Sequence, residues 1–206
     1  MSRTGPAEVP GMDVFEAIRK RRAVRQYRPD PVSREQVKVV LDAANQAPSG
    51  MNRQPWEFIV VTGSTILEMG KSYRSTLIEY LKNWDTSPMK KALSRDDFIR
   101  FAETYGGAPV VIVLLVKADP LPNFRKADLE SASAAMENLM LAATALGLGT
   151  CWMTGPIRDE ENLRRILAIP VDREIVAVTP LGHPEQIPPA PARLDPGMEQ
   201  KVRWVE

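Results

Sequence analysis

Two short segments carry the residues of this chain that are best suited to bind a charged, flat ligand. Arg21, Arg22 and Arg25 place three guanidinium groups close together at the end of an expected helix. Pro48-Ser49-Gly50-Met51-Asn52 is a turn with hydroxyl and amide side chains that leads into an apolar strand. Guanidinium groups bind phosphate through paired hydrogen bonds and stay charged at any working pH. Together, the two segments predict a pocket for a phosphorylated, planar cofactor.

Each segment also has a purely structural interpretation. Basic residues are common in the last turn of a helix, where they complement the helix dipole, so the arginines could form a solvated helix end. The turn could simply precede a strand, although loops with several polar side chains between rigid elements are typical of binding sites. Val24 divides the basic cluster, so Arg25 can point away from Arg22 if this segment is extended.

Three later positions are further candidates. Thr154-Gly155-Pro156 follows a short apolar stretch, and a glycine there would let a backbone N–H approach a ligand closely. Arg193 lies in a Pro-rich segment stiff enough to fix its side chain, with an ordinary solvent-exposed arginine as the equal alternative. His183 is the one conventional acid–base residue, but no serine or cysteine nucleophile accompanies it, so hydrolytic triad chemistry has little support.

Several familiar sites are excluded. Gly147-Leu148-Gly149 follows an expected helix and precedes an expected strand, the reverse of a dinucleotide-binding turn, and no P-loop pattern occurs. Cys151, the only cysteine, lies in an apolar run and predicts a buried thiol. With one cysteine and one histidine, a zinc site of the usual ligands cannot form, so we expect no bound metal.

Length and charge narrow the class of protein. A chain of 206 residues is typical of one domain with its own core, and its formal net charge of +1 creates no field that would attract nucleic acid or a membrane. The N-terminus shows no signal peptide, and the most apolar segment, 109–116, is too short to cross a bilayer. We therefore expect a cytoplasmic protein.

The hydrophobic pattern predicts alternating helices and strands. Asp13 caps a short helix on which Val14, Ala17 and Ile18 share a face, and Ser33 with Gln36 forms a capping box. The expected helices cover 14–22, 34–47, 64–84, 128–146 and 159–167, the last one capped by Asp159. The expected strands cover 57–61, 109–116, 150–153 and 174–179, with 57–61 and 109–116 both buried.

The remaining segments are less regular. Residues 85–105 form a polar, mobile or partly helical excursion, Gly147 is a C-terminal helix cap, and 201–206 could add a strand to a sheet edge, possibly that of another subunit. The order of elements indicates an α+β fold or a three-layer α/β/α sandwich with helices on both faces of a small sheet. The apolar helix 128–146 belongs in a core or against a partner subunit.

Four segments together closely resemble the successive motifs of the FMN-dependent nitroreductase family. They are Arg21-Arg22-Ala23-Val24-Arg25, Ala47 to Trp56, Gly147 to Trp152, and Leu181-Gly182-His183-Pro184, in the family's order. The resemblance implies a single nitroreductase-like domain over 1–206, with an N-terminal tail (1–12), a substrate-covering excursion (85–105) and a Pro-rich C-terminal arm (184–206). It also implies a mixed, mainly antiparallel sheet in an intertwined homodimer, with residues 136–146 in the dimer core.

The resemblance also implies a role for each matching residue. Arg21, Arg22, Ala23 and Arg25 would hold the phosphate and the pyrimidine edge of FMN, with Ala23 in place of the usual serine. Pro48, Ser49, Gly50 and Asn52 would reach the flavin from the other subunit. Thr154 and Gly155 would lie near flavin N5, and Arg193 would be a phosphate partner. His183 stands where the family usually has an aromatic residue.

The expected activity follows from this cofactor. FMN carries the hydride chemistry and the protein supplies position and charge, so no side chain need act as a nucleophile. The first hypothesis is an NADH- or NADPH-dependent reductase of nitroaromatics, quinones or similar flat small molecules, by a ping-pong cycle. The second is a reductive dehalogenase like iodotyrosine deiodinase, or a flavin-cleaving enzyme. The third is a flavin-binding redox sensor without catalysis.

Overall fold

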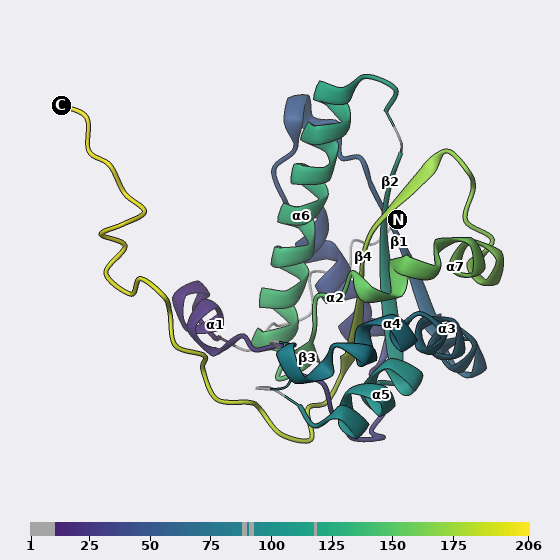
Figure 1. The fold of residues 1–206 in the computed structure, drawn as a ribbon. Helices are drawn as coiled ribbons and strands as arrows, with labels where there is room; N and C mark the ends of the chain where they lie inside the picture. Colours follow the sequence, from purple (N-terminus) through teal and green to yellow (C-terminus); the bar gives the residue numbers. More distant parts are fainter. Residues whose placement is uncertain (1–10, 88–89, 91–92, 118) are drawn as a thin grey trace.

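An antiparallel sheet of four strands in the order β1-β2-β4-β3 lies at the centre of the fold (Figure 1). The computed structural model describes residues 11–87, 90, 93–117 and 119–206, so most of the predicted N-terminal tail (1–12) lies outside the described residues. The strands are β1 (Trp56–Thr62), β2 (Val110–Lys117), β3 (Gly149–Thr150) and β4 (Arg173–Gly182). The α-helices are α1 (Val14–Lys20), α2 (Arg34–Asn45), α3 (Ser64–Ser75), α4 (Leu77–Lys82), α5 (Arg95–Thr104), α6 (Pro122–Ala145) and α7 (Glu160–Leu167).

Strand β2 is the most deeply buried element. It pairs with β1 on one side and with β4 on the other, and every residue from Val110 to Val116 is buried. Successive side chains of a strand point to opposite faces of the sheet. Val111 and Val113 therefore join one apolar cluster, while Ile112 and Leu114 join another.

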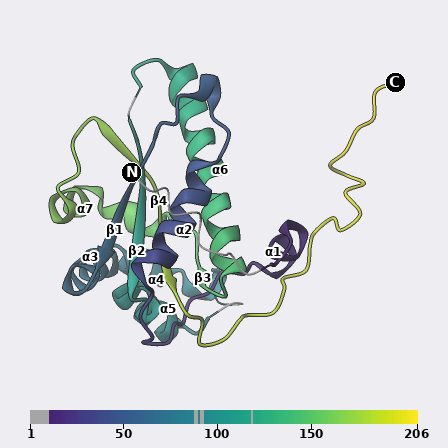
Figure 2. The same ribbon diagram turned by 180° about the vertical axis from the view of Figure 1, so that it is seen from behind.

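Helices cover both faces of the sheet. The long helix α6 packs against α2 on one face, and α3 packs against α5 on the other, with α4 and α7 on the same side as α3 (Figures 1 and 2). The predicted α+β class and the mainly antiparallel sheet are confirmed. The isolated parallel bridge between Ala23 and Thr150 is the exception to the antiparallel pairing in the described chain.

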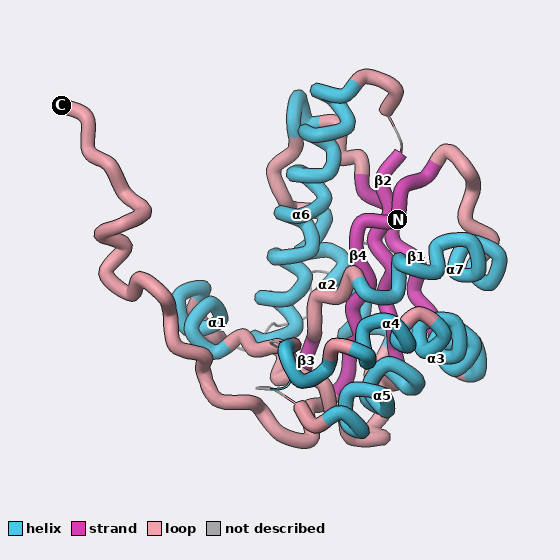
Figure 3. Tube along the Cα trace, in the orientation of Figure 1, coloured by secondary structure: helices cyan, strands magenta, loops and turns pink. Residues whose placement is uncertain are grey.

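Two segments extend away from this body. Helix α1 contacts the α6 side of the molecule, and the C-terminal arm passes on the outer side of α1 and ends far from the sheet (Figures 1 and 3). Only Ala17 of α1 is buried, so the shared face of Val14 and Ile18 was predicted correctly but stays exposed. Residues 201–206 form no strand and pair with none of the described strands; Trp204 is 86% exposed.

The helices predicted over 64–84 and 128–146 need correction, whereas helix α5 agrees with the partly helical alternative for 85–105. The helix expected over 64–84 is interrupted at Thr76, where the hydroxyl donates to the carbonyl oxygen of Tyr73 at 2.8 Å. Such side-chain bonds to the preceding turn bend helices. The excursion 85–105 contains helix α5, in which Phe98 and Phe101 are buried. Helix α6 begins at Pro122, before the expected Asp128, because proline is favoured in the first turn.

The strands also differ from the expected ranges. Strand β1 lies at the sheet edge and is only partly buried, with Val60 exposed, so the prediction of a fully buried strand over 57–61 is wrong. Strand β3 ends at Thr150, and only Met153 of the predicted continuation bridges Val178. Strand β4 runs from Arg173 to Gly182, beyond the expected 174–179, because β2 pairs with it from Arg173 to Leu181 and β3 pairs with Gly182.

The predicted helix caps are mostly correct. Asp13 accepts a hydrogen bond from the backbone N–H of Glu16, the Ser33–Gln36 capping box is complete, and Gly147 adopts φ of 73° after α6. Asp159 does not cap α7 with its side chain. Its carboxylate instead accepts a hydrogen bond from the hydroxyl of Ser72, at 2.7 Å, which competes with the local N–H groups.

The apolar side chains of α6 mostly serve this chain's own core. Met136, Leu139, Met140 and Ala143 are buried against α2 and the sheet, so they are not free to form the dimer core that the sequence suggested for residues 136–146. Glu137 is exposed, and Leu141 is half-buried. In the described part of the chain, no helix is both long enough and apolar enough to span a membrane.

A substitution at Gly70 would test the close contact between α3 and α5. A Cβ atom at Gly70 would lie 1.8 Å from the backbone oxygen of Glu103, so the two helices would have to separate. We expect Gly70→Ala to lower the free energy of unfolding in urea by roughly 1–3 kcal/mol, although alanine is the better helix former. Gly11→Ala, whose Cβ would meet nothing within 4 Å, is the matched control. Equal stability of the two variants would contradict the close packing.

Candidate functional site

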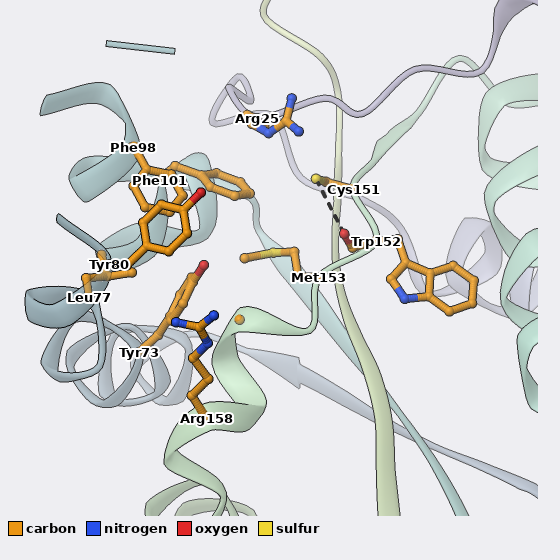
Figure 4. Close-up of a pocket in the computed structure, with 11 residues that line it drawn as sticks. Arg25, Tyr73, Leu77, Tyr80, Phe98, Phe101, Cys151, Trp152, Met153 and Arg158 are labelled. Atoms are coloured by element: carbon orange, nitrogen blue, oxygen red, sulfur yellow. Dashed lines mark hydrogen bonds between the residues drawn. The ribbon is translucent and has the colours of Figure 1, made fainter. Parts of the chain in front are cut away.

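An aromatic cavity lies between α3, α4, α5 and the segment that follows β3 (Figure 4). Its volume is about 180 Å³. Most of its wall is aromatic or apolar, and two arginines contribute charge. The lining residues are Arg25, Tyr73, Leu77, Tyr80, Phe98, Phe101, Cys151, Trp152, Met153, Gly155 and Arg158. Such a cavity suits a flat, partly polar molecule.

The aromatic wall comes from three consecutive helices. Tyr73 lies in the last turns of α3, Tyr80 in α4, and Phe98 and Phe101 on the buried face of α5. The ring centroids of Tyr80 and Phe98 are 5.4 Å apart, and Trp84 stacks on Phe98 at the same centroid distance. Mutual packing of these rings keeps the wall fixed.

Arg25 is the predicted arginine that faces the cavity. It lies in the extended segment after α1, where its Nη1 donates to the carbonyl oxygen of Ala23 at 3.2 Å. Its Nε is buried and has no hydrogen-bond partner among the described residues. A buried, unpaired donor of a charged group is costly unless a ligand satisfies it. Arg25 therefore retains donor capacity for an acceptor atom of a ligand.

Arg21 and Arg22 are oriented differently from Arg25. Nη1 of Arg22 donates to the carbonyl oxygens of Arg19 and Arg21, each at 2.6 Å, and Arg22 lines a separate cavity with Val24 and Gly147. Nε of Arg21 lies 3.7 Å from the carboxylate of Glu137 in α6. The cluster is thus divided as the intervening Val24 suggested.

Backbone contacts bring the arginine segment and the segment after β3 together. The N–H of Val24 donates to the carbonyl oxygen of Thr150 at 2.9 Å, which forms the parallel bridge beside Ala23. Gly149 permits this approach, because its Cβ would lie 2.8 Å from the Val24 side chain. Arg25 consequently lies next to residues 151–155. Thr154 is exposed at this edge, and Gly155 lines the cavity.

The turn at 48–52 is tightly held but lies elsewhere. Met51, Asn52 and Gln54 all have positive φ values, between 47° and 55°, which is uncommon for residues other than glycine. The Ser49 hydroxyl accepts a hydrogen bond from the backbone N–H of Gln54 at 3.0 Å, and the Gly50 N–H donates to the Ser131 hydroxyl at 3.3 Å. Pro48, Gly50 and Asn52 are exposed.

Arg53 ties this turn to the start of α6. Its Nη2 donates to the carboxylates of Asp119 at 2.7 Å and of buried Asp128 at 3.1 Å. Its guanidinium also lies over the ring of Phe124, 4.9 Å from the centroid. These contacts hold the hydroxyl and amide groups of 49–52 at the protein surface in one conformation.

The sequence-predicted site is therefore only partly assembled within one chain. The turn contacts α6 at Ser131, whereas Arg22 lies near Thr144, and these two positions are roughly 20 Å apart along the helix axis. Arg193 is exposed on the C-terminal arm and lines neither the aromatic cavity nor the cavity at Arg22. Arg25 and Gly155 share one cavity with Thr154 at its edge, whereas Arg21 and Arg22 do not line that cavity, and neither do Pro48 to Asn52 nor Arg193.

Burial determines the protonation of two groups at the cavity. Burial raises the pKa of the Cys151 thiol, which nearby Arg25 only partly offsets. The predicted buried thiol is confirmed, although Cys151 lies just outside β3. Burial also raises the pKa of Tyr73 to about 12. Both groups are therefore neutral near pH 7, and Arg25 and Arg158 are the charged side chains of the wall.

His183 lies outside this cavity. Its backbone oxygen accepts a hydrogen bond from the N–H of Arg28 at 2.9 Å, which joins the end of β4 to the segment after α1. Within the described ranges, no three His, Cys, Asp or Glu side chains gather in a way that could hold a metal ion.

Several lining residues were not identified from the sequence. The apolar face of α5 was visible in the sequence, because its apolar residues have the i, i+3, i+4, i+7 spacing of one helix face: Phe98, Phe101, Ala102 and Tyr105. Tyr73 was recognised as a helical residue but not as a site residue. Arg158 has no local sequence signal, because only the fold brings it to the cavity.

Comparisons with known proteins agree with these features. A model of the Nitroreductase family matches residues 18–183. A protein of Methanothermobacter thermautotrophicus, for which NADH dehydrogenase or NAD(P)H nitroreductase activity has been proposed, is 33% identical over 202 residues. That alignment covers 96% of this chain and 91% of the relative. A 4-nitrobenzoate reductase of Nocardioides sp. is 29% identical, over 89% of this chain and 88% of its own.

A solved structure shares the fold. A protein of Desulfovibrio desulfuricans, proposed to be a nitroreductase and determined in complex with FMN, superimposes with a TM-score of 0.70 at 29% identity. The alignment covers 94% of this chain and 97% of that one.

Tyr73 provides a pH test of the cavity. Because its folded-state pKa is raised from 10.0 to about 12, its contribution to stability is present below pH 10 and is lost as the pH rises toward 12. We expect Tyr73→Phe to lose less stability than the wild type over this range, by up to about 1.4 kcal/mol per pH unit. Urea unfolding at several alkaline pH values measures this. Parallel alkaline curves for the two proteins would contradict the buried phenol.

Proposed function

The chain belongs to the nitroreductase family, and on that premise we propose that it is an FMN-dependent NAD(P)H oxidoreductase of flat acceptors such as nitroaromatics or quinones. The observation that carries the proposal is Arg25, a guanidinium with an unpartnered donor at an aromatic cavity. The relatives named as reductases support the same reaction class. We infer that it works as a single domain in the cytoplasm.

The residues present fit FMN. The buried Nε of Arg25 would satisfy a ring acceptor atom, and Arg21, which is paired only loosely with Glu137, remains able to bind phosphate. Arg22 already donates to two backbone oxygens, so its remaining donors would complete the phosphate contacts. Ala23 offers only its backbone and methyl group, in place of a hydroxyl contact.

Bound FMN would supply the hydride chemistry, by a ping-pong cycle with NADH or NADPH as the donor. The protein's part is to bind, orient and shield. Arg25 would hold the ring edge, the exposed Thr154 hydroxyl and the Gly155 backbone would lie near flavin N5, and the aromatic wall would exclude water from a stacked acceptor. No side chain acts as a nucleophile in this scheme.

We further propose a three-layer α/β/α sandwich that forms an intertwined homodimer. The exposed apolar residues of α1 and of the C-terminal arm, such as Phe15, Leu194 and Trp204, support it, because a partner chain would remove these side chains from water. A partner chain would bring Ser49, Gly50 and Asn52 toward the cofactor, with Pro48 fixing the turn, and the arm would carry Arg193 to the phosphate.

The test of the activity starts from the purified protein. We expect yellow protein whose colour bleaches with NADH or NADPH and returns with a nitrofuran or a quinone. Halide release from a halotyrosine would instead indicate the dehalogenase. Bound flavin that no nicotinamide reduces would indicate a redox sensor, and colourless protein that takes up no FMN would overturn the proposal.

Arg25 is the residue that tests the cofactor site. We expect Arg25→Gln to raise the dissociation constant of FMN roughly tenfold to hundredfold, which is the usual worth of a hydrogen bond from a charged group. Quenching of FMN fluorescence during titration with apoprotein measures this constant. Arg34→Gln, a change of an exposed arginine in α2, is the control and leaves the constant unchanged. Equal affinities of both variants would contradict the assignment.

Mixing two variants tests the shared site. If Arg25 of one chain and Asn52 of the other hold the same FMN, then Arg25→Gln and Asn52→Ala each damage both sites of a homodimer. After equal amounts are unfolded and refolded together, half of the dimers are mixed, and each has one intact site. We expect recovery of about a quarter of the wild-type activity. Activity no higher than that of the separate variants would show that the two residues belong to the same chain's site or to none.

A further inference from the structure

Arg158 is a charged residue of the cavity that the proposed cofactor contacts do not use. We propose that Arg158 makes this cavity selective for flat aromatic acceptors that carry an anionic group, in the first place a carboxylate. The inference rests on the proposed reductase function and names the substrate class for it.

The charge balance of the cavity supports this selectivity. Arg25 and Arg158 line it, and among the side chains that the structure describes no Asp or Glu belongs to its wall. In the part of the chain that the structure describes, no carboxylate forms an ion pair with Arg158. The adjacent acids are engaged elsewhere: the Asp159 carboxylate accepts from Ser72 and Asn162, and Glu160 pairs with Arg164. With Arg25 assigned to the cofactor, Arg158 remains the cation available to an acceptor.

The position of Arg158 suits one end of a single ring. Gly155 and Arg158 belong to the same 3₁₀ helix, η5 (Gly155–Asp159), three residues apart. In such a helix residues i and i+3 lie on the same face, about 6 Å apart along the axis. Both line the cavity, so a ring whose reacting group lies at Gly155 would present its opposite substituent to Arg158.

The surroundings of Arg158 hold its guanidinium over an aromatic face. Its Cζ lies 5.7 Å from the ring centroid of Tyr80, and it points toward Tyr73 in the cavity (Figure 4). Arg158 is an exposed residue, so an anion can reach its guanidinium, and the Tyr80 ring covers one side of that cation. At Gly155 the Tyr73 hydroxyl is so close that a Cβ would lie 2.3 Å from it, which limits the space to a thin molecule.

The phosphates of NAD(P)H are another source of negative charge for the same guanidinium. The cavity volume of about 180 Å³ favours a one-ring acceptor, because pockets for larger ligands usually measure about 300–1,000 Å³. In a ping-pong cycle, the donor and the acceptor react in separate half-reactions, so rapid mixing can measure them separately.

The decisive comparison uses two acceptors of the same shape. We expect the flavin-loaded wild type to prefer 4-nitrobenzoate over 4-nitrobenzamide in kcat/KM, and Arg158→Gln to reduce this ratio by about tenfold. Arg158→Lys, which keeps the charge, recovers part of the preference. Arg165→Gln, on α7 and outside the cavity, keeps the wild-type ratio. A ratio unchanged in Arg158→Gln, or an equal loss for both acceptors, would overturn the inference.

A binding measurement separates this inference from the proposed function. By calorimetry on the oxidised protein, we expect benzoate to bind more tightly than benzamide, and Arg158→Gln to abolish the difference. In the reductive half-reaction, we expect Arg158→Gln to slow the reduction of the flavin by NADH or NADPH no more than Arg165→Gln does. If Arg158→Gln slows only the reduction of the flavin by NADH or NADPH and leaves the preference for benzoate unchanged, the assignment of Arg158 to a carboxylate is wrong. If the protein reduces both acceptors without any preference, only this inference is contradicted. If the protein binds no flavin and reduces neither acceptor, the proposed function is contradicted.

Discussion

The burial of strand β2 on both faces is the constraint on which the rest of the structure depends. Seven consecutive apolar residues, Val110 to Val116, are removed from water, a gross gain of roughly 10–20 kcal/mol before the entropy of folding is counted. Neither face can be left open, so α2 and α6 must cover one and α3 and α5 the other. The aromatic cavity lies on the side of the sheet that α3 and α5 cover, between these helices, α4 and the segment that follows β3.

The site takes its properties from this arrangement. The arginine segment bridges Thr150 beside the sheet, which places Arg25 between the aromatic wall and the backbone of residues 151–155. Because burial keeps Cys151 and Tyr73 neutral, the guanidinium groups set the charge of the cavity. The turn at 48–52, held by Arg53 and Ser131, faces away from this chain's cavity. Exposed apolar residues on α1 and the arm form the surface that the proposed homodimer would cover.

The sequence predicted correctly those features that depend only on residues close together in the chain. The caps at Asp13, Ser33 and Gly147 were correct because each involves only neighbouring residues. The prediction failed where a distant partner competed: Ser72 holds the Asp159 carboxylate, which would otherwise cap α7. The exposure of β1 at the sheet edge likewise depends on strand order, which a local pattern of apolar residues does not contain. Residues 85–105 were predicted to be partly helical, but the bounds and the buried face of α5 were not identified, because polar residues separate its apolar positions.

The sequence by itself determined the chemistry that is available: arginines in one short segment, a polar turn, a lone thiol in an apolar run, and no acid–base pair suited to hydrolysis. It determined the family as well, since four separated motifs keep their order. The tertiary structure alone decided which of these groups meet. Arg25 and Gly155 lie 130 residues apart in the chain and share one cavity, and Arg158 joins them through a single turn of 3₁₀ helix. Proximity of this kind depends on the packing of whole helices against the buried sheet, and that packing is a property of all the side chains together.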